Sequence, residues 1–570
     1  MTKSLDLIFL WHMHQPDYRD YTSGDFLLPW VYLHAIKDYT DMAYHLEQHP
    51  KMKAVVNFVP VLLDQLEDYE QQFASGKMRD PLLRLLARES LHDLDKEERD
   101  LILRSCFLSN HVKMVAPYPA YKRLSDLYKL LEPEGEAALA YLSGQYFADL
   151  LVWYHLSWCG ESLRREHDLI IRLMSKDEAY DLADRKQLFD LLGKAISGII
   201  PRYRKLAQSG QIEISTTPHY HPLAPLLLDL KSARESTPDS SLPQSPRYPG
   251  GTERVRFHVL SAQHSHHARF GVEPQGMWPA EGAVSTYLLE VLSEHGCKWA
   301  ASGEAVLANS LRRIDAALPE RSHYLYRPYH VGQKKGGVSC FFRDDHLSDL
   351  IGFEYSRWHG RDAALHFVAQ LEAIANQAPE DETPVVSVIL DGENAWEYFP
   401  YNGYHFLHDL YAALQDHPMV RCTTYQDYLK QRESEAGLAK QGELPSLVAG
   451  SWVYGNFATW IGSPDKNRAW DLLCVAKQSY DLVMASKRLT QAEKDAAERQ
   501  LASCESSDWF WWFGDYNPSH AVESFDRLFR HNLMRLYKML KLPVPPILNT
   551  PISHGGGKAE MGGAMRRSSE

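Results

Sequence analysis

The stretch VVSVILDGENAWEYFPYNG (residues 385–403) holds the pattern that decides the fold. An apolar, β-branched run ends abruptly in Asp391, Gly392 and Glu393. Such a run predicts a strand that is buried on both faces, as in a parallel sheet. Active sites of parallel barrels form where the strands end, and Asp391 and Glu393 project to one side if the strand geometry continues. An Asp-Gly turn or a divalent-cation site would explain the same residues.

Five more short apolar runs resemble this strand, and helical patterns separate them. Strand–helix alternation of this kind predicts an α/β fold with a parallel sheet or barrel. A mostly helical stretch from about residue 70 to 200 interrupts the alternation, and we expect it to be an insertion between two barrel strands. The five runs are LDLIFLW (5–11), KAVVNFV (53–59), QIEIST (211–216), QGMW (275–278) and KWAAS (298–302).

The pattern changes after about residue 430. Residues 431–545 are helical in pattern, and segments 480–504 and 523–541 within them are amphipathic, so we expect a helical domain packed on a catalytic domain of residues 1–430. Residues 546–570, which end in a Gly-rich segment from His554, are expected to be a flexible tail.

Composition excludes several classes of protein. A chain of 570 residues is too long for one ordinary core. Its net charge of -13 argues against a nucleic-acid binder, which needs a basic face. We expect no membrane span, because no run of about 18 apolar residues occurs, and we interpret the N-terminal apolar run as a strand that carries Asp6, not as a signal peptide. The 14 Trp and 31 Tyr suit the apolar faces of sugar rings, although a large core would use them too.

The cysteines predict a compartment. The seven are scattered and form no CxxC pair. This pattern fits reduced thiols in a cytoplasmic protein without a zinc knuckle. Nothing in the sequence indicates the oligomeric state.

Two histidines follow the first predicted strand in WHMHQPD (11–17). His12 and His14 are two residues apart and share a face of an extended segment. The spacing fits a metal site, a hydrogen-bonding pair for sugar hydroxyls, or imidazoles that the backbone satisfies. All three readings remain open at this point.

Carboxylates also accompany the middle strands. Glu213 lies within QIEIST, and His221 follows in the next loop. A buried glutamate needs a partner, so Glu213 is either a structural hydrogen-bond hub or a substrate contact. Glu281 follows a Trp-Pro step in GMWPAEGAVS (276–285), where it is either held at the barrel mouth or caps a helix.

Aromatic clusters occur near the start of the helical region. Trp452 and Trp460 lie in GSWVYGNFATWIG (450–462), and Asp508 adjoins three tryptophans in SSDWFWWFGD (506–515). These rings are either stacking platforms for sugars or the core that joins the helical domain to the barrel.

Taken together, five ordered segments resemble those that define glycoside hydrolase family 57. This family contains α-amylases, amylopullulanases, 4-α-glucanotransferases and glucan branching enzymes. The resemblance implies an incomplete (β/α)7 barrel followed by a helical domain. The segments are HMHQP (12–16), GQIEISTTPHYHP (210–222), GMWPAEGAVS (276–285), ILDGENAWEYFP (389–400) and SWVYGNFATWIG (451–462).

The resemblance also implies a mechanism. Glu281 falls on the position of the nucleophile and Asp391 on that of the general acid/base in a retaining hydrolase, whose carboxyl groups lie roughly 5–5.5 Å apart. The expected substrate is an α-1,4-linked glucan, with α-1,6 bonds also open, and no metal or cofactor is expected. The HQP segment with a long helical insertion is most similar to the α-amylase and amylopullulanase branch. The predicted substrate-binding residues are His12, His14, Glu213, His221, Trp278, Glu393, Trp452, Trp460 and Asp508.

Three alternatives accompany this prediction. A 4-α-glucanotransferase or branching enzyme would use the same site if a sugar hydroxyl replaced water. A zinc-dependent hydrolase, such as an α-mannosidase or polysaccharide deacetylase, would use His12, His14 and an aspartate as ligands. A non-catalytic glucan-binding protein would keep the groove without turnover.

Overall fold

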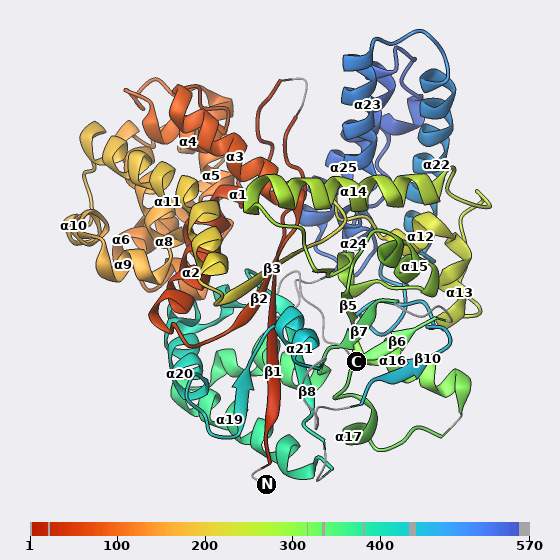
Figure 1. Ribbon diagram of the computed structural model, residues 1–570. Helices are drawn as coiled ribbons and strands as arrows, with labels where there is room; N and C mark the ends of the chain where they lie inside the picture. The colour runs from red at the N-terminus through yellow and green to blue at the C-terminus, as the bar shows by residue number, and fades with distance from the viewer. Residues whose placement is uncertain are drawn as a thin grey trace.

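A curled, mostly parallel sheet forms the centre of the molecule, and helical bodies rise from it on two sides (Figure 1). The computed structural model describes residues 3–20, 23–315, 317–332, 337–379, 382–432 and 440–557. The sheet order is β10-β6-β7-β5-β4-β3-β2-β1-β8, and β9 pairs with β1. The strands are β1 (Leu5–Met13), β2 (Ala54–Phe58), β3 (Ile212–Thr216), β4 (Gly276–Met277), β5 (Trp299–Ser302), β6 (Tyr329–Val331), β7 (Ser339–Phe342), β8 (Val385–Asp391), β9 (Val420–Cys422) and β10 (Gly442–Leu444).

The sheet curls into a barrel that barely closes. The pairs along β8-β1-β2-β3-β4-β5-β7 are all parallel. Beyond the end of β7, Arg343 forms a parallel bridge with Ser387 of β8. The predicted incomplete (β/α)7 barrel is therefore confirmed. The register places His12 of β1 opposite both Asn57 of β2 and Asp391 of β8, so these three side chains leave their strands at one level.

The barrel interior is apolar because the strands are buried on both faces. Every residue of β1 is buried. Ile8, Trp299 and Ile389 belong to an inner cluster that also contains Tyr425 of helix α21 (Tyr425–Arg432). Trp299 is the first residue of β5 and packs on Tyr425 with ring centroids 4.3 Å apart, so α21 fills the N-terminal end of the barrel. The opposite end is left for a site.

Helices cover the outside of the barrel. Before β2 lie α1 (Trp30–His34) and α2 (Thr40–Gln48). Later in the chain α14 crosses the barrel in Figure 1, and α19 and α20 pack beside β1. These and the other helices outside the barrel are α12 (Ala224–Leu228), α13 (Ala233–Ser236), α14 (Gly251–Phe270), α15 (Thr286–Glu294), α16 (Glu304–Ile314), α17 (Arg321–Tyr324), α18 (Asp345–Asp349), α19 (Gly360–Gln377) and α20 (Tyr404–Leu414).

One helical body stands between β2 and β3 in the chain and forms the upper left of Figure 1. It runs from α3 (Pro60–Ser75) to α11 (Leu182–Gln208) and occupies the stretch where we expected an insertion. Between these two lie α4 (Pro81–Ala87), α5 (Lys96–Ser105), α6 (Pro119–Leu131), α7 (Glu136–Leu139), α8 (Gly144–Trp158), α9 (Glu161–Glu166) and α10 (Asp168–Lys176).

The C-terminal helices form the second body, at the upper right of Figure 1. They are α22 (Pro464–Met484), α23 (Gln491–Cys504), α24 (Asp508–Trp512) and α25 (Ser519–Met539). Glu505, fully buried between α23 and α24, anchors them to α14: it accepts hydrogen bonds from Arg254 Nε at 2.9 Å and His258 Nε2 at 2.8 Å. Burial opposes ionisation of Glu505, but Arg254 and His258 hold its pKa at about 2. The ion pair fixes where the next residues, Ser507 and Asp508, lie.

Two sequence expectations differ from the structure here. The single amphipathic pattern over 480–504 divides into α22 and α23, because Thr490 and Glu493 form a capping box that starts a new helix. The first part of the expected tail packs against α25: Ile552 is buried, and its N–H donates to Asp526 at 2.7 Å. Residues 558–570 of that tail lie outside the described residues.

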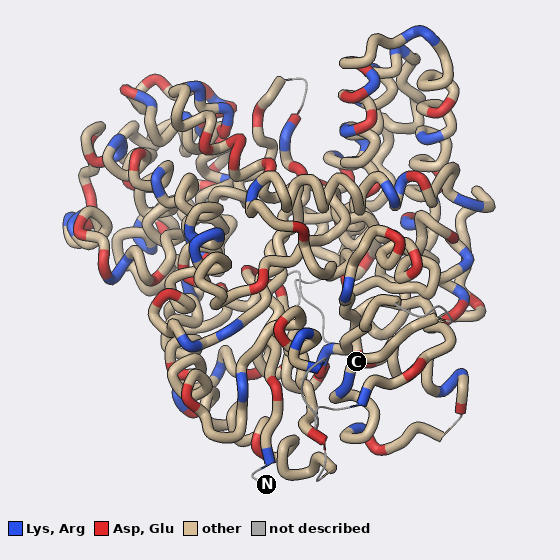
Figure 2. The backbone as a smooth tube through the Cα atoms, viewed as in Figure 1, with Lys and Arg blue, Asp and Glu red and all other residues tan. Residues whose placement is uncertain are grey.

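Lys and Arg alternate with Asp and Glu along the backbone of the sheet region and of both helical bodies in Figure 2. None of the described helices combines the length and the apolar character that crossing a membrane requires. All seven cysteines are unpaired.

Candidate active site

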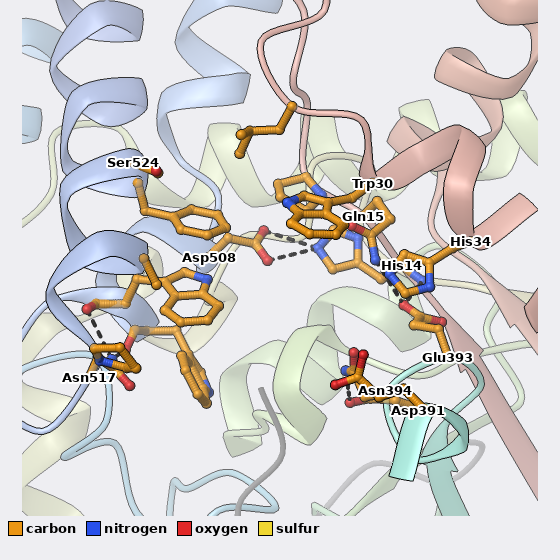
Figure 3. A pocket seen from close by; sticks show the side chains of 18 of the residues that line it. His14, Gln15, Trp30, His34, Asp391, Glu393, Asn394, Asp508, Asn517 and Ser524 are labelled. Atoms are coloured by element: carbon orange, nitrogen blue, oxygen red, sulfur yellow. Dashed lines mark hydrogen bonds and ion pairs between the residues drawn. The ribbon is translucent and has the colours of Figure 1, made fainter. Parts of the chain in front are cut away.

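A pocket of about 580 Å³ opens at the C-terminal ends of the barrel strands, between the two helical bodies. Carboxylates reach it from three distant parts of the chain: Glu281 after β4, Asp391 at the end of β8, and Asp508 at the start of α24. Figure 3 shows Asp391 and Asp508 facing the cavity from opposite sides. The pocket is lined by eight of the eleven predicted site residues, namely His12, His14, His221, Glu281, Asp391, Glu393, Trp452 and Asp508.

The backbone at Glu281 is in the left-handed region, with φ 60° and ψ 22°. This conformation is uncommon for a residue other than glycine, and the surroundings must enforce it. Gly282 follows with φ 56°, and a Cβ there would lie 2.6 Å from the Trp278 ring. The segment around Trp452 holds the loop from the other side, because Trp452 N–H donates to Glu281 O at 3.1 Å. The strained turn thus points the Glu281 carboxylate into the pocket.

Two donors approach the carboxylate of Glu281. Trp452 Nε1 donates to Oε2 at 3.2 Å, and Ser507 Oγ lies 3.5 Å from Oε1. Burial raises the pKa of Glu281 well above its ordinary value, and the charges of Asp508 and Asp391 raise it further, while the two donors oppose the shift. The carboxylate is therefore costly to ionise unless donors or a substrate compensate it.

Asp391 is the last residue of β8, and Glu393 follows two residues later; both line the pocket. Burial raises the pKa of Asp391 to about 6, although Asn394 Nδ2, which donates to Oδ2 at 2.8 Å, opposes the shift. Burial and the nearby charge of Asp391 raise the pKa of Glu393 well above its ordinary value. Glu393 Oε1 accepts from His14 N–H at 3.2 Å, whereas Oε2 has no partner among the described residues. Glu393 is therefore suited to hydrogen-bond a ligand hydroxyl.

A chain of hydrogen bonds connects the barrel interior to the helical body. Asn57 Oδ1 lies 2.7 Å from His12 Nδ1, His12 Nε2 lies 3.2 Å from His221 Nε2, and His221 Nδ1 lies 2.9 Å from Ser507 Oγ. Burial lowers the pKa of His12 to about 3 and that of His221 well below its ordinary value, so both rings are neutral. An amide oxygen only accepts, so Nδ1 of His12 carries its proton. His221 then donates through Nε2 and accepts from Ser507, whose single proton serves either His221 or Glu281 at one time.

His14 lies beside this chain. Its ring stacks on His221 with centroids 3.8 Å apart, and its Nε2 lies 3.0 Å from both carboxylate oxygens of Asp508 (Figure 3). Ser506 Oγ also donates to Asp508. The cluster of His14, His221 and Asp508 therefore joins the barrel to α24 at the pocket wall.

Three predicted substrate-binding residues do not line the pocket. Glu213 lies two residues below the level of Ser215, which pairs with Asn57, and it accepts from Trp299 Nε1 at 2.7 Å and from the N–H of Gln426 at 2.9 Å. Of the two alternatives that the sequence left open, Glu213 is therefore the structural hydrogen-bond hub, and it lies at the N-terminal end of α21. Trp460 is fully buried in the core, where its carbonyl accepts from Trp470. Trp278 is fully buried beneath Gly282 and supports the turn at Glu281.

The structure adds residues that the sequence did not single out as site residues. Asn57, in the apolar run of β2, orients His12, and Asn394 contacts Asp391. Their positions near the ends of predicted strands are the feature of the sequence that could have identified them. Ser507 adjoins Asp508, but nothing local indicated that this segment meets Glu281. Arg343 binds Asp345 at 2.7 Å and also lines the pocket, against the face of the Trp452 ring.

Comparisons with known proteins extend the sequence evidence. The profile of Glycosyl hydrolase family 57 matches residues 8–440. A GH57-type branching enzyme from Pyrococcus horikoshii has a similar structure, with a TM-score of 0.55 and 15% identity over 96% of this chain and 94% of that chain. A GH57 branching enzyme from Thermococcus kodakaraensis gives a TM-score of 0.56 and 16% identity over 94% and 90% of the two chains. An α-amylase from Thermotoga maritima gives 0.54 and 13% over 95% and 93%. Identities this low establish a shared fold. No curated protein matches the sequence.

Proposed function

Because this chain belongs to glycosyl hydrolase family 57, we propose that it cleaves α-1,4-linked glucans, such as starch, glycogen or maltodextrin, with retention of anomeric configuration. The observation that carries the proposal is the convergence of Glu281 and Asp391 on one pocket from the ends of β4 and β8. A retaining glycosidase needs one carboxylate as nucleophile and a second carboxyl group as proton donor.

In the first step Glu281 attacks the anomeric carbon, and the bond to the leaving oxygen breaks as Asp391 protonates that oxygen. In the second step water adds to the anomeric carbon, gives its proton to Asp391 and releases Glu281. Burial raises the pKa of both carboxyl groups, and the charges of Asp508 and Asp391 raise that of Glu281 further, so the two groups hold a proton near neutral pH. The assignment of Glu281 as nucleophile and Asp391 as acid rests on their positions in the family's segments. Trp452 favours the charge on Glu281, and Ser507 does so when its proton turns from His221 to Glu281.

The remaining residues of the pocket suit sugar binding. His12, His14, His221, Glu393 and Asp508 offer donors and acceptors for hydroxyls. Half-exposed aromatic rings at the wall, including Trp30 and Trp512, cover apolar sugar faces. We further propose a cytoplasmic location, which the unpaired cysteines support.

Product analysis on maltoheptaose, amylose and pullulan tests the proposal. Short maltodextrins from amylose are expected of an α-amylase, and additional cleavage of pullulan's α-1,6 bonds indicates an amylopullulanase. Chains longer than the substrate indicate a 4-α-glucanotransferase, and new branch points a branching enzyme. No change in any substrate would refute the proposal and leave a glucan-binding protein.

The roles of the two carboxylates need a separate experiment. Glu281→Ala should abolish turnover, and azide should restore part of it with an inverted glycosyl azide as product. Asp391→Ala should instead give azide rescue with a retained product. The reverse pattern would exchange the two roles. Turnover that disappears with a chelator and returns with Zn²⁺ would favour the zinc-dependent class.

A further inference from the structure

His14, His221 and Asp508 bring one ligand atom each within 4.8 Å of one another. They come from three separate elements: His14 follows β1, His221 lies in the loop after β3, and Asp508 begins α24. His14 Nε2 lies 3.0 Å from Asp508 Oδ2, and His221 Nδ1 lies 3.8 Å from the same oxygen. All three residues line the pocket.

We propose that these three residues form a site for a divalent d-block cation, with Zn²⁺ as the reference ion, and that a bound ion competes with glucan for the pocket. The second half of the proposal rests on the proposed function, whereas the first half does not. Two imidazoles and a carboxylate are a common ligand set for Zn²⁺.

The distances fit a tetrahedral ion. Zn²⁺ binds imidazole nitrogen and carboxylate oxygen at about 2.0–2.2 Å, which places neighbouring tetrahedral ligand atoms roughly 3.4 Å apart. The distances of 3.0 and 3.8 Å from Asp508 Oδ2 to the two imidazoles lie on either side of that value. Small side-chain rotations therefore complete three corners and leave the fourth to water.

The hydrogen-bond chain behind His221 prepares it as a ligand. His221 donates through Nε2 to His12, which donates in turn to Asn57, so the Nδ1 lone pair of His221 is directed at Ser507 and Asp508. Metal-binding histidines commonly use their other ring nitrogen in this way, because that hydrogen bond fixes the tautomer. When an ion binds Nδ1 of His221, the Ser507 hydroxyl loses its hydrogen bond to that nitrogen and can rotate to donate to Glu281 instead.

His14 and the local charge supply the other requirements. Nδ1 of His14 is buried and has no hydrogen-bond partner among the described residues, so this ring is held mainly by Asp508. Glu281 and Asp391 line the same cavity and add negative charge near the cluster. A cation is therefore electrostatically favoured there. A ligand set taken up by an ion cannot also bind sugar hydroxyls, which is why we expect competition.

A titration of the full-length, chelator-treated protein with ZnCl₂ tests binding directly. Calorimetry should give one tight site, and Co²⁺ should give the intense visible absorption of a tetrahedral complex. Asp508→Asn and His221→Gln, which keep side-chain size, should each weaken Zn²⁺ binding by at least about 100-fold, the upper end of losses caused by indirect partners. Circular dichroism would establish that both variants fold.

His34→Gln is the matched control. His34 lines the same pocket and lies 2.6 Å from Asp38, but Lys37 Nζ occupies that carboxylate at 2.8 Å and disfavours a cation. Zn²⁺ binding should survive this change. Absence of saturable binding by the wild type, or wild-type affinity in both ligand variants, would refute the site.

Maltoheptaose separates the two halves of the proposal. It should raise the apparent Kd for Zn²⁺ in proportion to its concentration, and Zn²⁺ should inhibit turnover that persists in chelator. Zn²⁺ affinity unaffected by saturating maltoheptaose would refute the competition. If the protein turns over no glucan under any condition, the proposed function fails, while the ZnCl₂ titration still decides the site.

Discussion

Replacement of Asn394 by alanine should move the pH dependence of catalysis in a direction that the structure fixes. Asn394 Nδ2 donates to Asp391 Oδ2 at 2.8 Å and stabilises the ionised carboxylate, whose pKa is about 6. A hydrogen bond to a charged group contributes about 1.5–3 kcal/mol, and partial solvent access at this rim reduces it to about 1–2 kcal/mol. One pKa unit corresponds to about 1.4 kcal/mol, so the pKa of Asp391 should rise by about one unit, to about 7.

The assay is the pH profile of kcat/KM on a chromogenic maltooligosaccharide. The proposed first step needs protonated Asp391, so kcat/KM should fall as pH rises through the pKa of Asp391. In Asn394→Ala this alkaline limb should move upward by about one pH unit. Ser524→Ala is the control: Ser524 lines the same pocket, but its hydroxyl donates to His520 O, and its limb should stay in place. A limb in Asn394→Ala that stays or moves to lower pH would refute Asp391 as the acid.

Three further changes test other parts of the structure. Trp452→Phe keeps the ring but removes the 3.2 Å donor to Glu281, so kcat/KM should fall about 10-fold or more; an unchanged value would show that this donor is dispensable. Trp460→Ala should reduce the free energy of unfolding by about 3–5 kcal/mol and leave maltoheptaose affinity unchanged in calorimetry, whereas lost affinity in a stable variant would return Trp460 to the site. Burial lowers the pKa of His45 to about 3 in the folded protein, whereas in the unfolded chain this histidine is protonated below about pH 6.5. The free energy of unfolding should therefore decrease as the pH falls, by about 2 kcal/mol from this residue at about pH 5. Urea unfolding at neutral pH and at about pH 5 measures this loss, which His45→Phe should reduce.

The sequence located the barrel strands well where burial on both faces produced continuous apolar runs. All six predicted runs correspond to strands, from β1 to β8. The strands that it missed are short: β6, β9 and β10 have three residues each, and β7 has four. So few residues carry no periodic signal, and the equally short β4 and β5 were found because they lie in apolar runs. They are defined by pairing with distant strands, which no local pattern reports.

The sequence predicted which strand ends contribute to the site, but not how far along the barrel axis each residue within a strand lies. Asp391 and Glu281 follow their strands, and the general rule for parallel barrels was enough to bring them together. Glu213 shows the limit of that rule: it lies inside β3, and only the pairing of Ser215 with Asn57 reveals that Glu213 faces α21 and not the pocket. Trp460 was ambiguous for a similar reason, because an aromatic residue in a polar segment can be core or platform.

The contribution of the C-terminal helices could not be derived from any motif alone. Ser507 reaches Glu281 from 226 residues along the chain, and its N–H donates to His221 O at 2.9 Å, so it docks on the loop after β3. Glu505, two residues earlier, is held by Arg254 and His258 of α14. The anchoring ion pair and the hydroxyl beside the proposed nucleophile are thus parts of one short segment.

This arrangement couples the docking of the C-terminal helices to the chemistry of the barrel. The barrel supplies Glu281 in a strained turn, but the donors that favour its charge, Trp452 and Ser507, both come from beyond residue 440. Burial and the charges of Asp508 and Asp391 raise the pKa of Glu281, and these donors oppose that shift. The residues after 430 therefore do more than cover one end of the barrel: they supply the donors that favour the charge of the proposed nucleophile and, in Asp508, a charge that opposes it.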